Sequence, residues 1–193
     1  LTYKKTLFEN HHFDALLGYT SQKTQTINSS INASDYPDDE VGFFNAATTR
    51  VGSGSKSAWS MISYLARLNY DYKDKYMLSV SFRRDGCSRF GANARWANFP
   101  SVSAGWVMSD ESFMKGIDKI SFLKVRGSWG KVGNNNIGNY TSISSISSNN
   151  YVLGGVTTPG RQLSNLGNAN LTWETTKSWD LGLDLGLFNN RIY

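Results

Sequence analysis

Residues 64–85 alternate between apolar and polar side chains, and this period of two constrains the fold more than any other feature of the chain. Every second residue from Tyr64 to Phe82 is apolar, apart from a break at the polar triplet 73–75. Successive side chains of a β-strand point to opposite faces of the sheet, so the pattern predicts two strands with one apolar and one polar face. Residues 171–188 repeat it, with Trp179 and four leucines on one parity and aspartates and glycines on the other.

The whole chain divides into such segments. The alternation predicts seven strands and the beginning of an eighth, at about residues 1–8, 13–22, 57–72, 76–85, 99–109, 121–131, 171–188 and from Ile192 to Tyr193. The stretches 24–56, 86–98 and 132–170 are predicted as polar loops, the last with short strands inside it, and one helical turn is expected after Ser109. Short and long connections then alternate along the chain, so an up-and-down antiparallel sheet would carry tight turns at one end and long loops at the other. Outer-membrane barrels have this layout.

Strand length favours the same reading. From Trp179 to Phe188 the strand advances nine residues, about 30 Å at roughly 3.3 Å per residue. Tilted by about 45°, it spans roughly 21 Å, close to the apolar band of about 25 Å in such barrels. Aromatic residues lie near both expected ends of the strands: Tyr70, Tyr72, Tyr76 and Trp106 by the short turns, and Tyr19, Phe82, Trp129 and Trp179 toward the loops.

The predicted fold class is therefore all-β, an antiparallel up-and-down segment of a transmembrane β-barrel. A soluble or surface-exposed β-sandwich that binds carbohydrate is the alternative, since its strands also alternate, but they average only about 5–6 residues. The lipid-facing residues are predicted to include Leu78, Val80, Phe82, Leu181, Leu183, Leu185 and Leu187. The lumen-facing polar residues are predicted to include Arg67, Asp71, Arg83, Asp85, Lys124, Arg126, Asp180 and Asp184.

Two finer expectations follow from these strands. If 121–131 and 171–188 are antiparallel neighbours, and the turns near residues 120 and 189 are roughly level, opposed residue numbers sum to about 308–310. Arg126 can then form a lumen-wall ion pair with Asp184 that Lys124 is close enough to share. On the apolar parity, Arg84 and Lys177 lie just beyond the loop-side aromatics, where a cation can meet anionic lipid headgroups.

Composition excludes or disfavours several other kinds of protein and binding site. The net charge is +5, but the basic residues are scattered and do not form the cluster that nucleic acid requires. Cys87 is the only cysteine, which excludes a disulfide within the chain and a cysteine-based metal site. His11 and His12 are adjacent, so on a strand they point to opposite faces and are poor co-ligands. No run approaches 18 apolar residues, and the start "LTYKK" lacks the apolar core of a signal peptide.

Chemistry-bearing motifs are weak. The histidines lie far from the loop end, which argues against a catalytic triad, and "GSWGKVG" at 127–133 has valine where a phosphate-binding loop needs Ser or Thr. We expect no enzyme and no cofactor. The acidic loop "DYPDDE" is a weak calcium candidate through Asp35, Asp38, Asp39 and Glu40, against a solvated acidic tip, because the EF-hand spacing is missing. The Asn-rich "GNNNIGNY" and the loop aromatics can stack on sugars, pack the loops or contact a partner: Tyr36, Phe43, Phe44, Trp96 and Tyr151.

Five motifs in order resemble one family over nearly the whole chain. They are "YLARLNYDYKDKYMLSVSFRRDGCSRFG", "RWANFPSVSAGW", "ESFMK", "ISFLKVRGSWGKVGNNNIGNY" and "NLTWETTKSWDLGLDLGLFNNRIY". Together they are similar to the middle-to-late barrel of SusC/RagA-class TonB-dependent outer-membrane transporters. Cys87 stands where that family usually has serine, and a thiol there has no predicted role.

The resemblance implies a 22-stranded barrel in the outer membrane, plugged by an N-terminal domain. It implies uptake of oligosaccharides or peptides, energised by the TonB complex through a TonB box. It further implies a SusD-like surface lipoprotein as the lid, membrane lipid as a partner and no nucleic acid. Residues 1–193 then form part of the barrel domain. The plug, TonB box and signal peptide are expected outside this chain, which is read as a portion of a longer protein because seven strands cannot close such a barrel.

Overall fold

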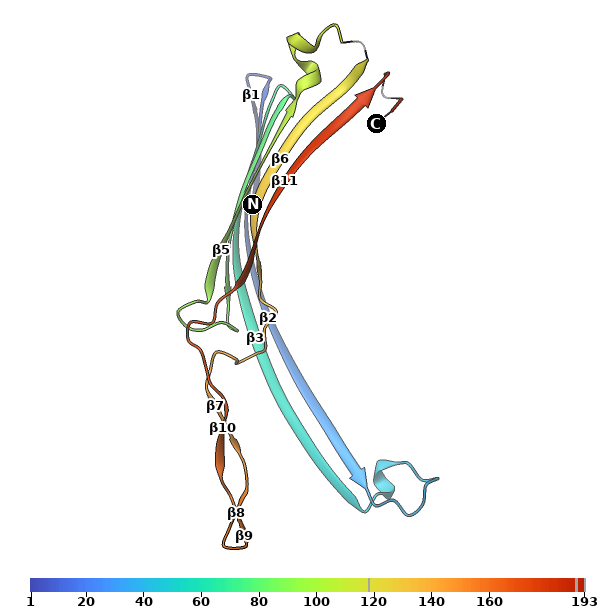
Figure 1. Cartoon of the computed structure of the whole chain (residues 1–193), viewed down its shortest axis with the longest axis vertical. Coiled ribbons are helices and arrows are strands. Elements are labelled where there is room, and N and C mark those ends of the chain that lie inside the picture. The colour runs from blue at the N-terminus through green and yellow to red at the C-terminus, as the bar shows by residue number, and fades with distance from the viewer. Residues whose placement is uncertain (118, 190, 193) are drawn as a thin grey trace.

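The computed structural model describes residues 1–117, 119–189 and 191–192, and its main feature is one seven-stranded antiparallel sheet (Figure 1). The strand order β1-β2-β3-β4-β5-β6-β11 follows the chain, so each strand lies beside its predecessor in an up-and-down arrangement. The strands are β1 (Thr2–Leu7), β2 (His11–Ser34), β3 (Thr49–Tyr72), β4 (Tyr76–Cys87), β5 (Trp96–Val107), β6 (Ile120–Asn134) and β11 (Glu174–Leu187). This confirms the predicted all-β class and topology.

Smaller elements lie in the connections. Two two-stranded ribbons occupy the loop between β6 and β11, formed by β7 (Ser145–Ser148) with β10 (Arg161–Asn165) and β8 (Tyr151–Leu153) with β9 (Val156–Thr158). Short 3₁₀ turns cover Phe44–Ala46, Met108–Asp110 and Ser112–Met114, the last two at the predicted helical turn. In the described part of the chain, no helix has the length and apolarity needed to cross a membrane.

Tight turns and long loops gather at opposite ends of the sheet, as expected (Figure 1). The link 88–95 is nevertheless shorter than the turn-side link 108–119, so the alternation of lengths fails at that pair. The cause is that β4 continues to Cys87 and β5 begins at Trp96, within the stretch 86–98 that the sequence predicts as a loop.

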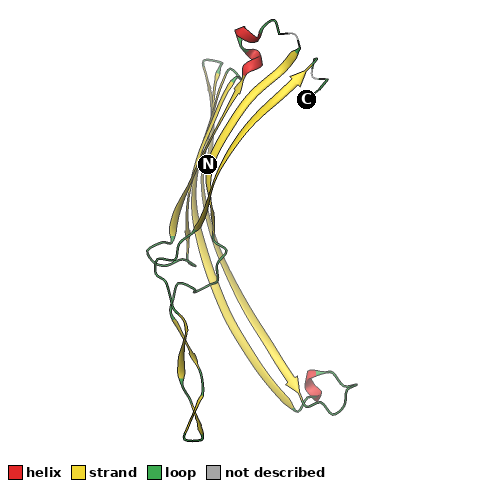
Figure 2. Ribbon diagram, in the orientation of Figure 1, coloured by secondary structure: helices red, strands yellow, loops and turns green. Residues whose placement is uncertain are grey.

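The largest difference from the sequence prediction is the stretch 24–56. β2 and β3 are each 24 residues long and stay paired to Ser34↔Thr49, which leaves only residues 35–48 as a loop. This outer half is rich in Ser, Thr, Asn and Gly, and Ile27, Ile31 and Ala33 are the few apolar residues that continue the apolar parity of β2. The alternation is therefore too sparse for the sequence to indicate a strand there. Figure 2 shows the two strands projecting together beyond the rest of the sheet.

The register places the mainly apolar set of alternate residues from every strand on one face of the sheet, and the mainly polar set on the other face. Between β6 and β11 the pairs Asp180↔Ser128 and Asp184↔Lys124 both sum to 308, which confirms the predicted register. The register shifts between Gly186 and Leu187, so alternation alone does not fix the face of Leu187.

Candidate functional site

The apolar face of the sheet is open to its surroundings. The exposed fraction is 90% for Leu181, 62% for Leu183 and 46% for Phe82, and Val80, Leu78 and Leu185 on the same parity are also exposed. Water-soluble proteins rarely expose so continuous an apolar surface. Each predicted lipid-facing residue except Leu187 lies on this face by register.

Aromatic side chains border this face at both ends. At the loop end, ring centroids are 5.5 Å apart for Tyr19 and Tyr64 and 6.0 Å apart for the cross-strand pair Trp129 and Trp179. At the turn end, Tyr76 stacks with Tyr72 at 6.1 Å and with Trp106 at 6.2 Å. Two aromatic bands around an apolar strip are the arrangement of a membrane-spanning barrel wall.

Trp96 belongs to the loop-end band and is not a loop residue. It begins β5 on the apolar face, stacks on Tyr64 at 6.1 Å and holds the Arg84 guanidinium 5.2 Å from its ring. The sequence predicts Trp96 as one of the loop aromatics that can stack on sugars, pack the loops or contact a partner, whereas the structure places it on a strand.

The turn 108–119 is fastened to the turn-end band through Glu111. The Tyr76 hydroxyl donates a hydrogen bond to Glu111 Oε1 at 2.7 Å, and Lys75 Nζ lies 3.8 Å from the same carboxylate. The hydrogen bond from Tyr76 is the main reason that the pKa of Glu111 lies below its ordinary value. A carboxylate that receives a hydrogen bond in its ionised form is held in that form.

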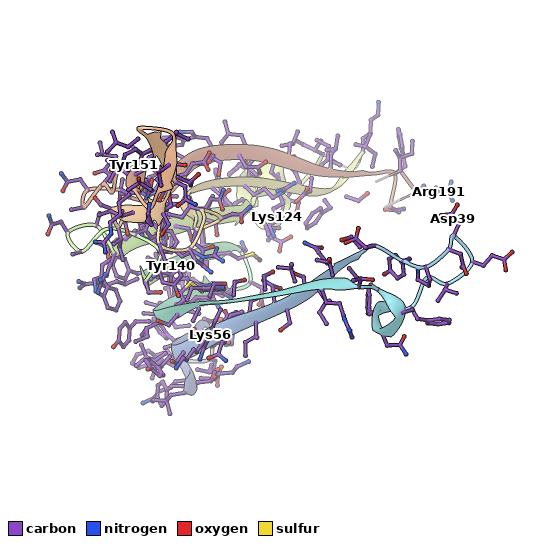
Figure 3. All side chains as sticks on the ribbon, turned by 90° about the horizontal axis from the view of Figure 1, so that it is seen from below. Asp39, Lys56, Lys124, Tyr140, Tyr151 and Arg191 are labelled. Atoms are coloured by element: carbon purple, nitrogen blue, oxygen red, sulfur yellow. The ribbon has the colours of Figure 1, made fainter. Side chains whose placement is uncertain are left out.

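The polar face lies on the concave side of the sheet. Figure 3, seen from below, shows the sheet curving around a trough into which Lys124 points. A hollow of about 700 Å³ over this face is lined by residues from all seven strands. Its charged and polar members include Asp14, Asn69, Asp71, Ser79, Ser103, Lys124, Arg126 and Asp180. In a barrel, the concave side of the wall is the side of the lumen.

Ion pairs connect neighbouring residues on this polar face. Arg126 Nε lies 3.5 Å from Asp184 Oδ1, which confirms the predicted contact, and Arg126 Nη1 lies 3.3 Å from Asp180 Oδ1. Lys124 is directly opposite Asp184 but forms no ion pair with it among the contacts of the described residues. Toward the loops, Arg83 Nε lies 2.7 Å from Asp85 Oδ1.

The remaining predicted lumen residues share that face. Arg67 is paired with Leu16 and Ser81, and Asp71 accepts a hydrogen bond from the backbone N–H of Asp74 at 2.9 Å. Sequence reasoning missed the pair of Lys4 and Asp14, 3.2 Å apart. The sequence pattern could have indicated this ion pair, because both residues belong to the polar set of alternate residues in the β1–β2 hairpin.

At the loop end, two connections fold onto the polar face and form the main buried cluster. Phe90 from 88–95 and Trp173 from the loop before β11 pack with ring centroids 4.6 Å apart, and Cys87 and Phe99 complete the buried set. Cys87 is 1% exposed, so it is a buried strand residue and not a loop thiol. The backbone N–H of Gly91 donates to the carbonyl of Leu171 at 3.1 Å, which ties the two connections together.

Arg89 is anchored in the same region. Its guanidinium lies 4.4 Å from the Trp59 ring and donates hydrogen bonds to Asn139 Oδ1 at 2.8 Å and the Asn135 carbonyl at 3.0 Å. The Asn-rich segment therefore packs against the barrel wall. This favours loop packing over cargo binding for that part of the motif.

The acidic loop does not gather a cation site. Asp35 accepts a hydrogen bond from Thr49 and Asp38 from the backbone of Glu40 and Val41, and the described side chains of 35–40 bring no three ligand atoms together. A different group, His12 with Asp71 and Asp74, has ligand atoms within 4.8 Å of one another. It is assembled by the β2–β3 register at the turn end, and His12 and His11 do point to opposite faces: His12 Nδ1 bonds Thr6, and His11 Nδ1 bonds Tyr70.

The remaining loop aromatics are accessible. Phe43 is 75% and Phe44 59% exposed at the tip of the β2–β3 hairpin, while Tyr151 is exposed at the far ribbon and Tyr36 is half-buried. These positions suit contact with a cargo or a partner, without distinguishing the two.

An open, curved sheet with an apolar convex face, two aromatic bands and a charged concave face is a segment of an outer-membrane barrel wall. Sequence comparison agrees, since residues 2–193 match the family described as "TonB dependent receptor-like, beta-barrel". The chain belongs to this family of TonB-dependent receptors. Similar proteins include TonB-dependent receptor P26 of Formosa agariphila, 36% identical over 100% of this chain and 20% of the relative. TonB-dependent receptor SusC of Bacteroides thetaiotaomicron is 38% identical over 69% of this chain and 14% of the relative.

Solved structures agree with the sequence relatives. A structure of the RagAB peptide transporter superposes with a TM-score of 0.83 at 29% identity, covering 98% of this chain and 21% of that chain. The RagAB peptide importer in its open-open state gives 0.85 at 27% identity over the same shares. The resemblance to the SusC/RagA class is thereby confirmed, and the chain spans about a fifth of the length of the relatives that it matches along its whole length.

Proposed function

We propose that this chain forms part of the barrel domain of an outer-membrane transporter that takes up large nutrients, either oligosaccharides or peptides. Transport is energised through TonB, and a SusD-like lipoprotein covers the loop end. The observation that carries the proposal is the division of the sheet into an exposed apolar convex face and an ion-paired concave face. Lipid on one side and a wet lumen on the other account for both faces at once.

The cargo and partner classes are argued from relatives. One sequence relative bears the name SusC, and one solved relative is described as the RagAB peptide transporter. Exposed loop-end aromatics such as Phe43 and Tyr151 suit either a sugar ring, a peptide or a lid. The sandwich alternative requires a second sheet packed on the first, whereas the described residues form, apart from the main sheet, two two-stranded ribbons.

Orientation is tested by single cysteines in the full-length protein on intact cells, in a Cys87→Ser background. A membrane-impermeant thiol reagent should label Ser53→Cys, on the outer half of β3, and should leave Asp74→Cys, in a tight turn, unlabelled until the cells are broken. Labelling of Asp74→Cys alone on intact cells would reverse the topology.

Uptake is tested with a strain that lacks the full-length gene. Growth on a panel of oligosaccharides and peptides as sole carbon source should fail for one cargo class and return with the gene. A protonophore should stop accumulation of that cargo while leaving its binding at the cell surface intact. Unchanged growth on every member of the panel would contradict the proposed transport.

A further inference from the structure

Charge is distributed unequally between the two faces of the seven-stranded sheet. Every acidic residue in its strands lies on the polar face: Asp14, Asp71, Asp85, Glu174, Asp180 and Asp184. The apolar face has no aspartate or glutamate in these fully described strands, yet it carries basic residues: Lys5, Lys23, Arg50, Lys56, Arg84, Lys131 and Lys177.

Four of these cations lie close together in depth, just beyond the loop-end aromatic band. Lys131 and Lys177 follow the Trp129 and Trp179 pair by two residues, or about 5 Å after strand tilt. Arg84 is two residues beyond Phe82 and Lys23 four beyond Tyr19. In a tilted barrel, residues paired across strands do not lie at one membrane depth, because the depth shifts by about one residue per strand. Tyr19, Tyr64 and Phe82 therefore lie at the depth of the tryptophans, although they are not in the same hydrogen-bonded row.

None of these four cations has a counter-charge among the described residues. Lys131 and Lys177 are direct register partners, an arrangement that is destabilising for like charges on opposed strand positions. No carboxylate of the described residues forms an ion pair with any of the four, whereas Arg83 and Arg126 on the polar face are both paired. An anion from outside the chain would remove this repulsion.

The surroundings specify what kind of anion fits. Below the four cations lies the strip of exposed Leu181, Leu183, Phe82 and Val80, which accepts acyl chains. The Trp96 ring holds the Arg84 guanidinium 5.2 Å from its centre, at the level where headgroups begin. A phosphorylated lipid matches both features, because its phosphate can meet the cations while its chains cover the strip.

We propose that Lys23, Arg84, Lys131 and Lys177 form a binding belt for the phosphate groups of lipids in the outer leaflet. The belt rests on the proposed membrane orientation. The Lys131 and Lys177 pair is its centre, since one phosphate between two opposed ammonium groups replaces a repulsion by two attractions. Phosphorylated lipid is thus a specific ligand of this wall and not only its solvent.

The test uses the full-length protein in phosphatidylcholine nanodiscs, with or without diphosphoryl lipid A, and measures Tm. Lipid A should raise Tm, and Lys131→Gln with Lys177→Gln should remove about half of the rise, because each basic residue at such a surface contributes similarly. The matched control is Lys124→Gln, on β6 but on the concave face, which should keep the full rise. An undiminished rise in the double variant overturns the belt.

Further measurements distinguish lipid phosphate from free phosphate, and test separately whether the protein enters a membrane. Inorganic phosphate added to phosphatidylcholine nanodiscs should leave Tm unchanged, and a rise equal to that with lipid A would overturn a lipid ligand. Dephosphorylated lipid A should give a smaller rise, and an equal rise would overturn phosphate recognition. A protein that remains soluble and never enters nanodiscs would instead refute the proposed barrel wall.

Discussion

Leu183→Arg should be the most damaging single change on the convex face. Leu183 is 62% exposed and lies four residues from Trp179, which is about 13 Å along the strand and about 9 Å in depth at a 45° tilt. An apolar band of about 25 Å has its midplane roughly 12 Å below the aromatics, so position 183 is close to it. Its register partner is Val125, and no carboxylate of the strands shares its face.

A guanidinium near the midplane costs about 2–4 kcal/mol in such barrels. At 1.4 kcal/mol per tenfold, the ratio of inserted to uninserted protein falls by about 30- to 700-fold. The assay is the amount of full-length protein in the outer membrane that shows heat-modifiable mobility on a gel. Leu183→Arg should reduce it strongly at equal expression.

The control introduces the same side chain on the other face. Ser128→Arg lies opposite Asp180 on the concave side, where the new guanidinium stays in water beside a carboxylate. Gly182→Ala is a poorer control, because a Cβ there would lie 2.6 Å from the guanidinium carbon of Arg126. Equal amounts of inserted Leu183→Arg and Ser128→Arg would refute a lipid-facing convex surface.

Three further outcomes are expected of the full-length protein. Arg126→Gln should cost only about 0–1 kcal/mol in denaturant midpoints, since its ion pairs are half-exposed, and a loss above about 2 kcal/mol would show that they are not hydrated. Because the bond from Tyr76 lowers the pKa of Glu111, its stabilisation of the turn 108–119 is present above the ordinary carboxyl pKa and is lost as the pH falls through the lowered value. Hydrogen exchange in this turn should therefore quicken in acid, whereas Glu111→Gln should exchange faster already at neutral pH, and normal protection in that variant would count against the anchor. Phe90→Ala should cost about 3–5 kcal/mol and open residues 88–95 to protease, while the exposed Phe44→Ala should change stability by less than about 0.5 kcal/mol.

The sequence predicted the part of the fold where a membrane imposes a pattern. β4, β6 and β11 must be apolar on alternate residues, so their existence, faces and pairing follow from Leu78 or Leu183 and their neighbours. The β6–β11 register also followed, because the turns near residues 120 and 189 lie at the same end of the sheet and at about the same level. The contact between Arg126 and Asp184 was predicted from this register.

Outside the apolar band the sequence predicted less. The outer halves of β2 and β3 are mostly polar, with Ile27 and Ile31 as sparse exceptions, and they are held together mainly by backbone pairing. The cluster of Phe90 with Trp173 joins connections far apart in sequence, which no local pattern reveals. One signal was available: Trp59, Met61 and Phe99 are apolar residues on the polar parity at the loop end, which indicates that something covers them there.

The long β2–β3 hairpin acts mechanically as a lever arm on its β3 side. β3 loses its second neighbour after Met61↔Cys87, and beyond that pair it is hydrogen-bonded in the sheet to β2 alone (Figures 1 and 2). Each strand is 24 residues long, about 80 Å at 3.3 Å per residue, so much of the arm stands clear of the bilayer. The fixed end of the arm is at Trp59 and Met61, which pack against the cluster of Phe90 and Trp173. On the β3 side, a load applied to the tip is therefore transmitted through the β2–β3 ladder to the aromatic packing at Trp59 and Met61.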